Sequence, residues 1–353
     1  MKHVLSVLLG LGVVVLLIAA GVDRAAAARG VPGSPAFAIG AAMPLNPTSL
    51  EAGIAAGAEL HSDWTLLPLS WAVLMPQPGA AQWDLLDRAV AAAVQQQTPV
   101  VISLSEAPAW AQTPQGPDAA QTAALVAQLV GRYGTALQAV ELFPRANTRA
   151  AWGAAANPAA YLTLLAQVQA AAPSLQLVAA GLQPLAVVQT GDMSDAAFLQ
   201  GLYDAGGAPY LTVVSMQLPQ TADDLMQMPS EQEPRVLRRY ETLRRVMTTN
   251  NHPSALLWIT HLDRAAAVTD VSQQVVWLQK AYTQVRSQLY ISAAFFQNLN
   301  APVQPGMLSL VQPDGSRHPF AAAYQTLLHQ NNPDLPLLLP GRSKEGALLK
   351  NRS

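Results

Sequence analysis

The sequence contains no cysteine among its 353 residues. This absence excludes a disulfide framework, a zinc site built on thiolates and a cysteine nucleophile. It leaves the redox compartment of the protein undecided. Any catalytic or binding chemistry therefore has to come from oxygen and nitrogen side chains.

Charge is also scarce, because Asp, Glu, Lys and Arg together make up 12% of the residues and the net charge is -2. Such a chain offers no basic field for phosphates, so we expect no nucleic-acid partner. The six histidines show neither H-x-x-x-H nor H-x-H spacing, and neither a P-loop nor a G-x-G-x-x-G motif follows a predicted strand. We therefore predict no metal site and no cofactor.

One long apolar run lies at the amino terminus, from Val4 to Val22, after Lys2 and His3. Small residues follow at Ala25 to Ala28, where a signal peptidase could cut. The run has about the 20 residues that a membrane-spanning helix needs, which is longer than most cleaved signals. Residues 1–30 are thus predicted to be a membrane anchor or a signal peptide, and the rest of the chain to be extracytoplasmic.

Short apolar runs alternate with helix-like segments about eight times between residues 31 and 330. This alternation predicts an α/β protein with a single (β/α)8 TIM barrel. Residues 331–353 are rich in Pro and Leu and then charged, which indicates a partly disordered extension. Within the helix predicted near 233–249, four arginines are interpreted as a solvated face: Arg238, Arg239, Arg244 and Arg245.

The stretch around which the predicted barrel is organised reads V-E-L-F-P-R-A-N, from Val140 to Asn147. It resembles the end of the fourth strand in clan-A glycoside hydrolases, which reads W-N-E-P-N. Further segments resemble the same clan in order: Trp64, Trp71 and Pro76 near the second strand, Ala107 to Ala111 after the third, and L-W-I-T-H-L-D at residues 257–263 in the seventh.

The resemblance implies two catalytic glutamates, a general acid/base in strand four and a nucleophile in strand seven. In this sequence Arg145 and His261 stand at those positions. Arginine has a pKa above about 12 and donates no proton near neutral pH, and histidine offers no oxygen nucleophile. The resemblance with these departures predicts an inactive barrel that binds carbohydrate or serves as a surface scaffold.

An active glycosidase with relocated acids is the alternative. Glu106, Glu141 and Asp263 lie near predicted strand ends, where barrel chemistry is found. Glu141 has the parity of Arg145 along the strand, so the two side chains are expected to point into the barrel and pair. A buried, structural Glu141 is the competing interpretation.

Aromatic rings on loops and strand ends are candidates for stacking on sugars, and Arg145 for pairing with an acidic sugar. The alternative for each ring is a place in the core. The predicted carbohydrate-binding set is Trp71, Trp110, Arg145, Asn147, Trp152, His261 and Phe296, with Phe295 as an alternative to Phe296.

Overall fold

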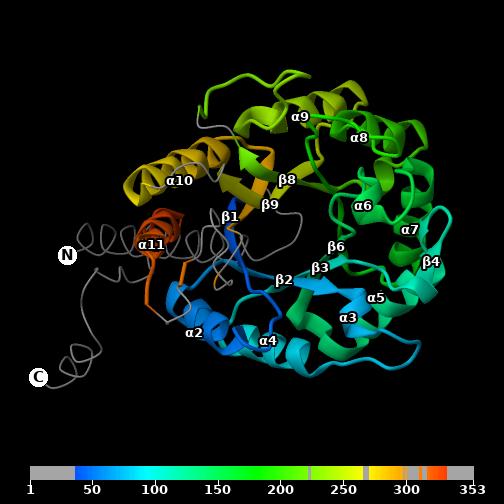
Figure 1. The fold of residues 1–353 in the computed structure, drawn as a ribbon, viewed down its shortest axis with the longest axis horizontal. Helices are drawn as coiled ribbons and strands as arrows, with labels where there is room; N and C mark the ends of the chain where they lie inside the picture. Colours follow the sequence, from blue (N-terminus) through cyan, green and yellow to red (C-terminus); the bar gives the residue numbers. More distant parts are fainter. Residues whose placement is uncertain are drawn as a thin grey trace, which may run out of the picture.

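The computed structural model describes residues 36–221, 224–264, 270–296, 299, 310–311 and 316–331. Eight parallel strands close into a barrel in the order β1-β10-β9-β8-β7-β6-β3-β2, and helices surround it (Figure 1). The strands are β1 (Ala38–Ala42), β2 (Trp64–Ser70), β3 (Val100–Ser105), β6 (Leu137–Leu142), β7 (Gln176–Leu182), β8 (Val213–Thr221), β9 (Leu256–Arg264) and β10 (Ile291–Phe296). The predicted single α/β barrel is confirmed.

The larger helices connect successive strands on the outside of the barrel. They are α2 (Leu50–Leu60), α4 (Asp84–Gln95), α5 (Ala119–Tyr133), α7 (Pro158–Ala171), α8 (Asp195–Asp204), α9 (Tyr240–Thr249), α10 (Val271–Arg286) and α11 (Pro319–Asn331). Several begin where a polar side chain caps the first turn: Asp118 accepts from Gln121 N, Asn157 from Ala160 N and Ser194 from Ala197 N.

Short elements lie in the loops between strands. These are the helices α3 (Trp71–Leu74) and α6 (Arg149–Trp152), the 3-10 turns η1 (Ala109–Ala111), η2 (Gly134–Ala136), η3 (Ala208–Tyr210) and η4 (Leu237–Arg239), and the hairpin of β4 (Gln112–Thr113) with β5 (Gly116–Pro117). No separate pattern in the sequence indicates the hairpin, because two-residue strands are too short to show a periodicity.

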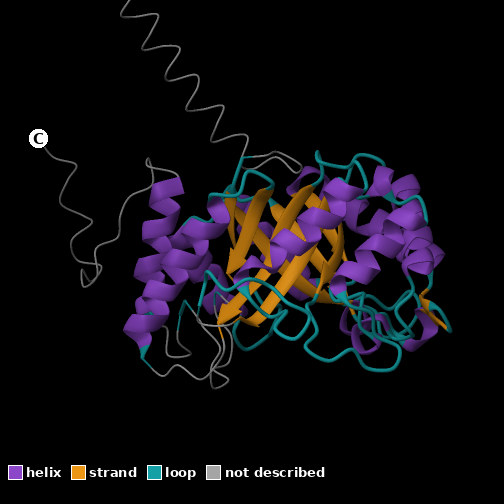
Figure 2. Cartoon of the chain, turned by 90° about the horizontal axis from the view of Figure 1, so that it is seen from above, coloured by secondary structure: helices purple, strands orange, loops and turns teal. Residues whose placement is uncertain are grey.

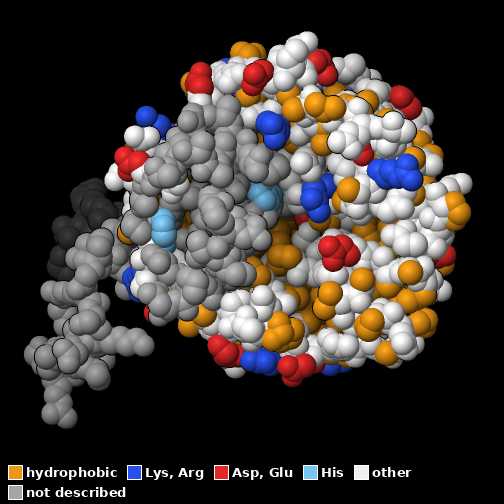
Figure 3. Space-filling model, viewed as in Figure 1, with side chains coloured by type: hydrophobic (Ala, Val, Ile, Leu, Met, Phe, Trp, Pro, Cys, Tyr) orange, Lys and Arg blue, Asp and Glu red, His pale blue; other side chains and the backbone are white. Residues whose placement is uncertain are grey.

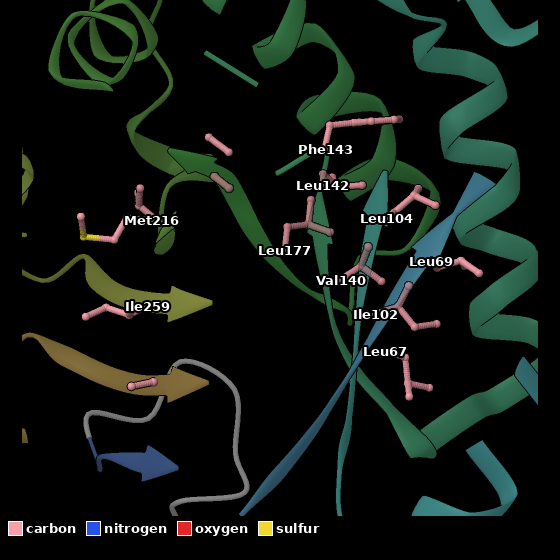
Figure 4. Close-up of a cluster of buried hydrophobic side chains, with 14 of the residues drawn as sticks. Leu67, Leu69, Ile102, Leu104, Val140, Leu142, Phe143, Leu177, Met216 and Ile259 are labelled. Atoms are coloured by element: carbon pink, nitrogen blue, oxygen red, sulfur yellow. The ribbon is translucent and has the colours of Figure 1, made fainter. Parts of the chain in front are cut away.

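Both faces of the strands are apolar because one packs inside the barrel and the other under the helices. The barrel interior contains small residues and a few large rings: Ala38, Ala42, Trp64, Leu66, Val101, Ala139, Val178, Val213, Trp258, Ala293 and Phe295. Outward-facing residues such as Ile102, Val140 and Leu177 belong to the larger core beneath the helices (Figure 4). Successive side chains of a strand alternate between these two faces, so the position of an inward-facing polar residue along its strand sets how deep it lies in the barrel.

The four arginines interpreted as a solvated face do not share one environment. Arg239 is 2% exposed and makes two hydrogen bonds to the buried carboxylate of Asp195, at 2.8 and 2.6 Å. Arg244 donates to two backbone carbonyls and lies over the ring of Tyr290. The solvated-face interpretation is therefore wrong for Arg239, whose partner lies 44 residues earlier in the chain.

Candidate functional site

The candidate residues lie at the carboxyl-terminal ends of the barrel strands. In Figure 2 the arrowheads point toward the side of the molecule that carries the longer loops. Figure 3 looks onto that face and shows basic, acidic and histidine side chains around apolar ones near its middle. This is the end at which barrel enzymes hold their active sites.

Arg145 follows β6 in a turn that breaks the alternation of the strand. Phe143 has φ of 48° and Arg145 φ of 65°, and Arg145 N donates to Gly181 O at 2.8 Å. These left-handed conformations turn the Arg145 side chain outward, where it is exposed. Its guanidinium has no hydrogen-bond or ion-pair partner within the described part of the chain.

His261 lies in β9 opposite Gln217 of β8. The residue is partly exposed, yet its Nε2 atom is enclosed and has no hydrogen-bond partner among the described residues. Burial lowers the pKa of His261 to about 3, and the nearby charge of Arg145 lowers it in the same direction. The imidazole is therefore neutral near pH 7, and Arg145 is the charged member of the pair.

Glu141 is fully buried inside the barrel and does not pair with Arg145. Its carboxyl oxygens accept hydrogen bonds from Ser103 Oγ of the neighbouring strand β3 at 2.5 Å and from Thr260 Oγ1 of β9, which is not a neighbour of β6, at 2.6 Å. Burial raises the pKa of Glu141, and hydroxyls including that of Ser215 oppose the shift. The predicted pairing is wrong because the turn at Phe143 sends Arg145 away from the barrel interior.

The other two candidate acids are Glu106 and Asp263. Glu106 is exposed after β3, with φ of 54°, and its carbonyl accepts from Ala72 N at 2.8 Å. Asp263 is in β9, but its side chain lies outside the described atoms. Across the residues that the structure describes, no three His, Asp or Glu side chains gather in the manner of metal ligands.

Two of the predicted sugar-stacking rings belong to the core. Trp71 and Trp152 are 0% and 1% exposed, so neither ring has a free face. Trp152 packs edge-on against Phe143, and its Nε1 donates to Gln115 O at 2.7 Å. We therefore remove both from the candidate set. Trp110 remains, because it is only partly buried, with its ring edge-on to Trp71.

Asn147 is fully buried and joins two loops. Its Nδ2 donates to the carbonyls of Gln183 and Met193, both at 2.9 Å, and its Oδ1 accepts from Gln183 N at 3.0 Å. These bonds occupy the amide, so the predicted contact with carbohydrate is replaced by a bracing role. The Phe296 side chain lies outside the described atoms, and Phe295 fills the barrel interior.

A hollow that the sequence did not reveal lies between the loops after β6 and β7. Its volume is about 580 Å³, and we call it the rim hollow. It is lined by Arg145, Thr148, Arg149, Ala150, Gly153, Gln183, Leu185, Val187, Gln189, Thr190 and Asp192. The sequence does show charged and polar residues after each of two neighbouring strands, which could have indicated such a hollow. Only the closed barrel shows that the two loops carrying these residues meet.

The neutral state of His261 predicts a loss of stability in acid. Its folded pKa lies below the unfolded value of 6.5, so the unfolded chain binds protons more readily below that pH. Between pH 7 and 5 this group is expected to cost roughly 1–2 kcal/mol, after discounting for its partial exposure. Urea unfolding of the natural chain and of His261→Gln at both pH values measures the difference. An equal decrease in the free energy of unfolding of both chains would contradict the lowered pKa of His261.

No family model matches the chain, and no curated protein matches it in sequence. Several solved structures match the chain in fold. A family 39 glycoside hydrolase from Bacteroides cellulosilyticus superimposes with a TM-score of 0.64 at 16% identity, over 85% of this chain. The intracellular xylanase TsXylA from Thermoanaerobacterium saccharolyticum gives 0.58 at 14% identity, over 82% of this chain and 95% of the xylanase. The chain has the fold of the clan-A glycoside hydrolases.

Further glycoside hydrolases share this fold at low identity. Xylanase 10B from Thermotoga petrophila, solved with xylobiose, superimposes with a TM-score of 0.58 at 12% identity, over 83% of this chain and 94% of the xylanase. This chain spans 64% of the length of the family 39 hydrolase.

The predicted anchor or signal at residues 1–30 lies outside the described residues. Within the described ranges, no helix is long and apolar enough to cross a membrane.

Proposed function

We propose that this glycoside-hydrolase-like barrel is an extracytoplasmic protein that binds carbohydrate at its carboxyl-terminal face without cleaving it. The observation that carries the proposal is the pair of groups at the ends of β6 and β9. An exposed, positively charged Arg145 and a neutral His261 stand where the resemblance to the clan implies two carboxyl groups. The apolar segment at residues 1–30 supports export and attachment to a membrane.

The chemistry of glycoside hydrolysis supports inactivity. A retaining enzyme needs one carboxylic acid to protonate the leaving oxygen and a carboxylate about 5 Å away to attack the anomeric carbon. The transition state carries positive charge on the sugar, and the guanidinium of Arg145 would destabilise it. Neither Arg145 nor neutral His261 supplies the oxygen nucleophile or the acid.

Relocated acids would make the barrel an active glycosidase instead. Glu141 is enclosed, and both of its oxygens accept hydrogen bonds from the barrel wall, which leaves no path to a sugar. Glu106 is exposed on a different loop from the pair of Arg145 and His261. These two environments favour binding over hydrolysis.

Hydrolysis and binding assays on the full-length chain test the proposal. The chain is incubated with a panel of aryl glycosides and, separately, titrated with oligosaccharides by calorimetry. We expect saturable binding of at least one oligosaccharide and no release of the aryl group above the rate in buffer. Turnover that disappears in Glu106→Gln or Asp263→Asn would overturn the inactive assignment. The absence of all binding would leave a scaffold as the function.

A further inference from the structure

We infer that the rim hollow binds an oxyanion carried by an acidic saccharide, held between the guanidinium groups of Arg145 and Arg149. The inference rests on the proposed carbohydrate-binding function and names the class of ligand. Arg145 lines the hollow at the end of β6, and Arg149 begins the short helix that follows it. A carboxylate or a sulfate ester on a sugar offers the paired acceptor oxygens that guanidinium groups bind best.

The two guanidinium groups of the rim hollow are unneutralised. Five other described arginines are paired with carboxylates: Arg88 with Glu51, Arg132 with Asp87, Arg238 with Glu241, Arg239 with Asp195 and Arg317 with Glu59. Neither Arg145 nor Arg149 has a side-chain hydrogen bond or ion pair to any described residue, although both are exposed at the same hollow. Like charges that line one hollow repel each other, and an anion bound in that hollow relieves the repulsion.

The single acid of the hollow does not cancel this charge. Asp192 is one of the lining residues, and its Oδ1 accepts from the backbone N of Arg149 at 2.8 Å. That bond holds the carboxylate against the backbone of the short helix. The described lining therefore carries one more positive than negative charge.

Hydrogen bonds between the loops hold the walls of the rim hollow in place. Arg145 N is bonded to Gly181 O, and Thr148 Oγ1 donates to Arg145 O at 3.0 Å. The buried amide of Asn147 fixes Gln183 on the opposite wall. Gly191, at φ of 92°, lies beneath the Arg149 side chain, and a Cβ there would come within 3.0 Å of Arg149 Cδ. A fixed frame reduces the entropy that binding costs.

The composition of the lining favours recognition by charge. None of the eleven described lining residues is aromatic. Binding sites for neutral saccharides depend on the faces of aromatic side chains, and the rings of Trp71 and Trp152 are buried elsewhere. Amide and hydroxyl groups of Gln183, Gln189 and Thr190 can bond the sugar hydroxyls, while the arginines bind the acidic group.

Calorimetric titration of the full-length chain tests the inference with three oligosaccharides of equal length. One carries uronic carboxylates, one carries sulfate esters and one is neutral. We expect at least one acidic ligand to bind about tenfold or more tightly than the neutral one, with an affinity that falls as salt is raised. Whichever acidic ligand binds more tightly identifies the source of the oxyanion.

Arg149→Gln and Arg145→Gln should each weaken acidic-saccharide binding about tenfold, because each removes a charge-assisted pair. Arg245→Gln is the matched control, since Arg245 is an exposed arginine on α9. It should change the affinity by less than about twofold. Thermal unfolding midpoints of the variants check that each is folded.

The outcomes separate this inference from the proposed function. Equal affinity for the neutral and acidic ligands, or an equal loss in Arg245→Gln and Arg149→Gln, would overturn the rim hollow as an anion site. Carbohydrate binding would then still stand. If no oligosaccharide binds the natural chain, both the inference and the proposed function fail.

Discussion

Replacing Asp195 with asparagine is expected to lower the free energy of unfolding by about 3–4 kcal/mol. Asp195 and Arg239 are 0% and 2% exposed, and their two hydrogen bonds form a bidentate pair between α8 and η4. Asparagine keeps one acceptor oxygen but removes the charge that balances the buried guanidinium. Urea denaturation of both chains at pH 7 measures the change.

The matched control is Glu241→Gln, because Glu241 forms a similar pair with Arg238 near the surface. The side chains of that pair are 22% and 24% exposed, so water screens their attraction. The expected cost is below about 1 kcal/mol. Equal costs for the two variants would show that burial does not set the strength of the Asp195 pair.

Glu141→Gln is expected to stabilise the protein at neutral pH and to have little effect at pH 4. Burial raises the folded pKa of Glu141 above its ordinary value of 4.5. The folded state then binds a proton that the unfolded chain releases above pH 4.5, so stability falls as pH rises through this range. Glutamine has nearly the same shape, bears no charge and removes this dependence.

Unfolding free energies at pH 4, 5.5 and 7 measure the effect of Glu141→Gln. The exposed Glu106 provides the control, and Glu106→Gln should follow the natural chain at all three pH values. A constant difference between Glu141→Gln and the natural chain across the range would mean that packing, rather than ionisation, separates them.

The barrel could be predicted from the sequence because its signals are local. Apolar runs, turn residues and helix caps mark each strand and helix separately, and eight alternations permit few topologies. The residues from Leu50 to Ala58, after a turn and cap, predict a small helix, and the apolar run from Leu175 to Gly181 predicts the fifth strand. Both lie within two residues of α2 and β7. The register between strands is not local, and it alone brings Ser103 and Thr260 to Glu141.

The candidate site was harder to predict for three physical reasons. Parity along a strand assigned Arg145 to the barrel interior, but the positive φ values of Phe143 and Arg145 break that parity. Their place on predicted loops and strand ends made Trp71 and Trp152 candidate platforms, while their burial depends on neighbours distant in sequence. The rim hollow forms where two loops meet, and the side-chain amide of Asn147 holds them together by hydrogen bonds to Gln183. The sequence motif alone could not show which residues this amide contacts.

The amide of Asn147 also couples the motions of the loops after β6 and β7. Its three hydrogen bonds join Gln183 and Met193 to the turn that carries Arg145, so local opening of one loop must release the other. The backbone N–H of Gln183, which donates to Asn147, would exchange with solvent deuterium only when this brace opens. A ligand in the rim hollow would therefore slow hydrogen exchange in both loops together, including at the backbone N–H of Met193, which donates to Asn147 O but does not line the hollow.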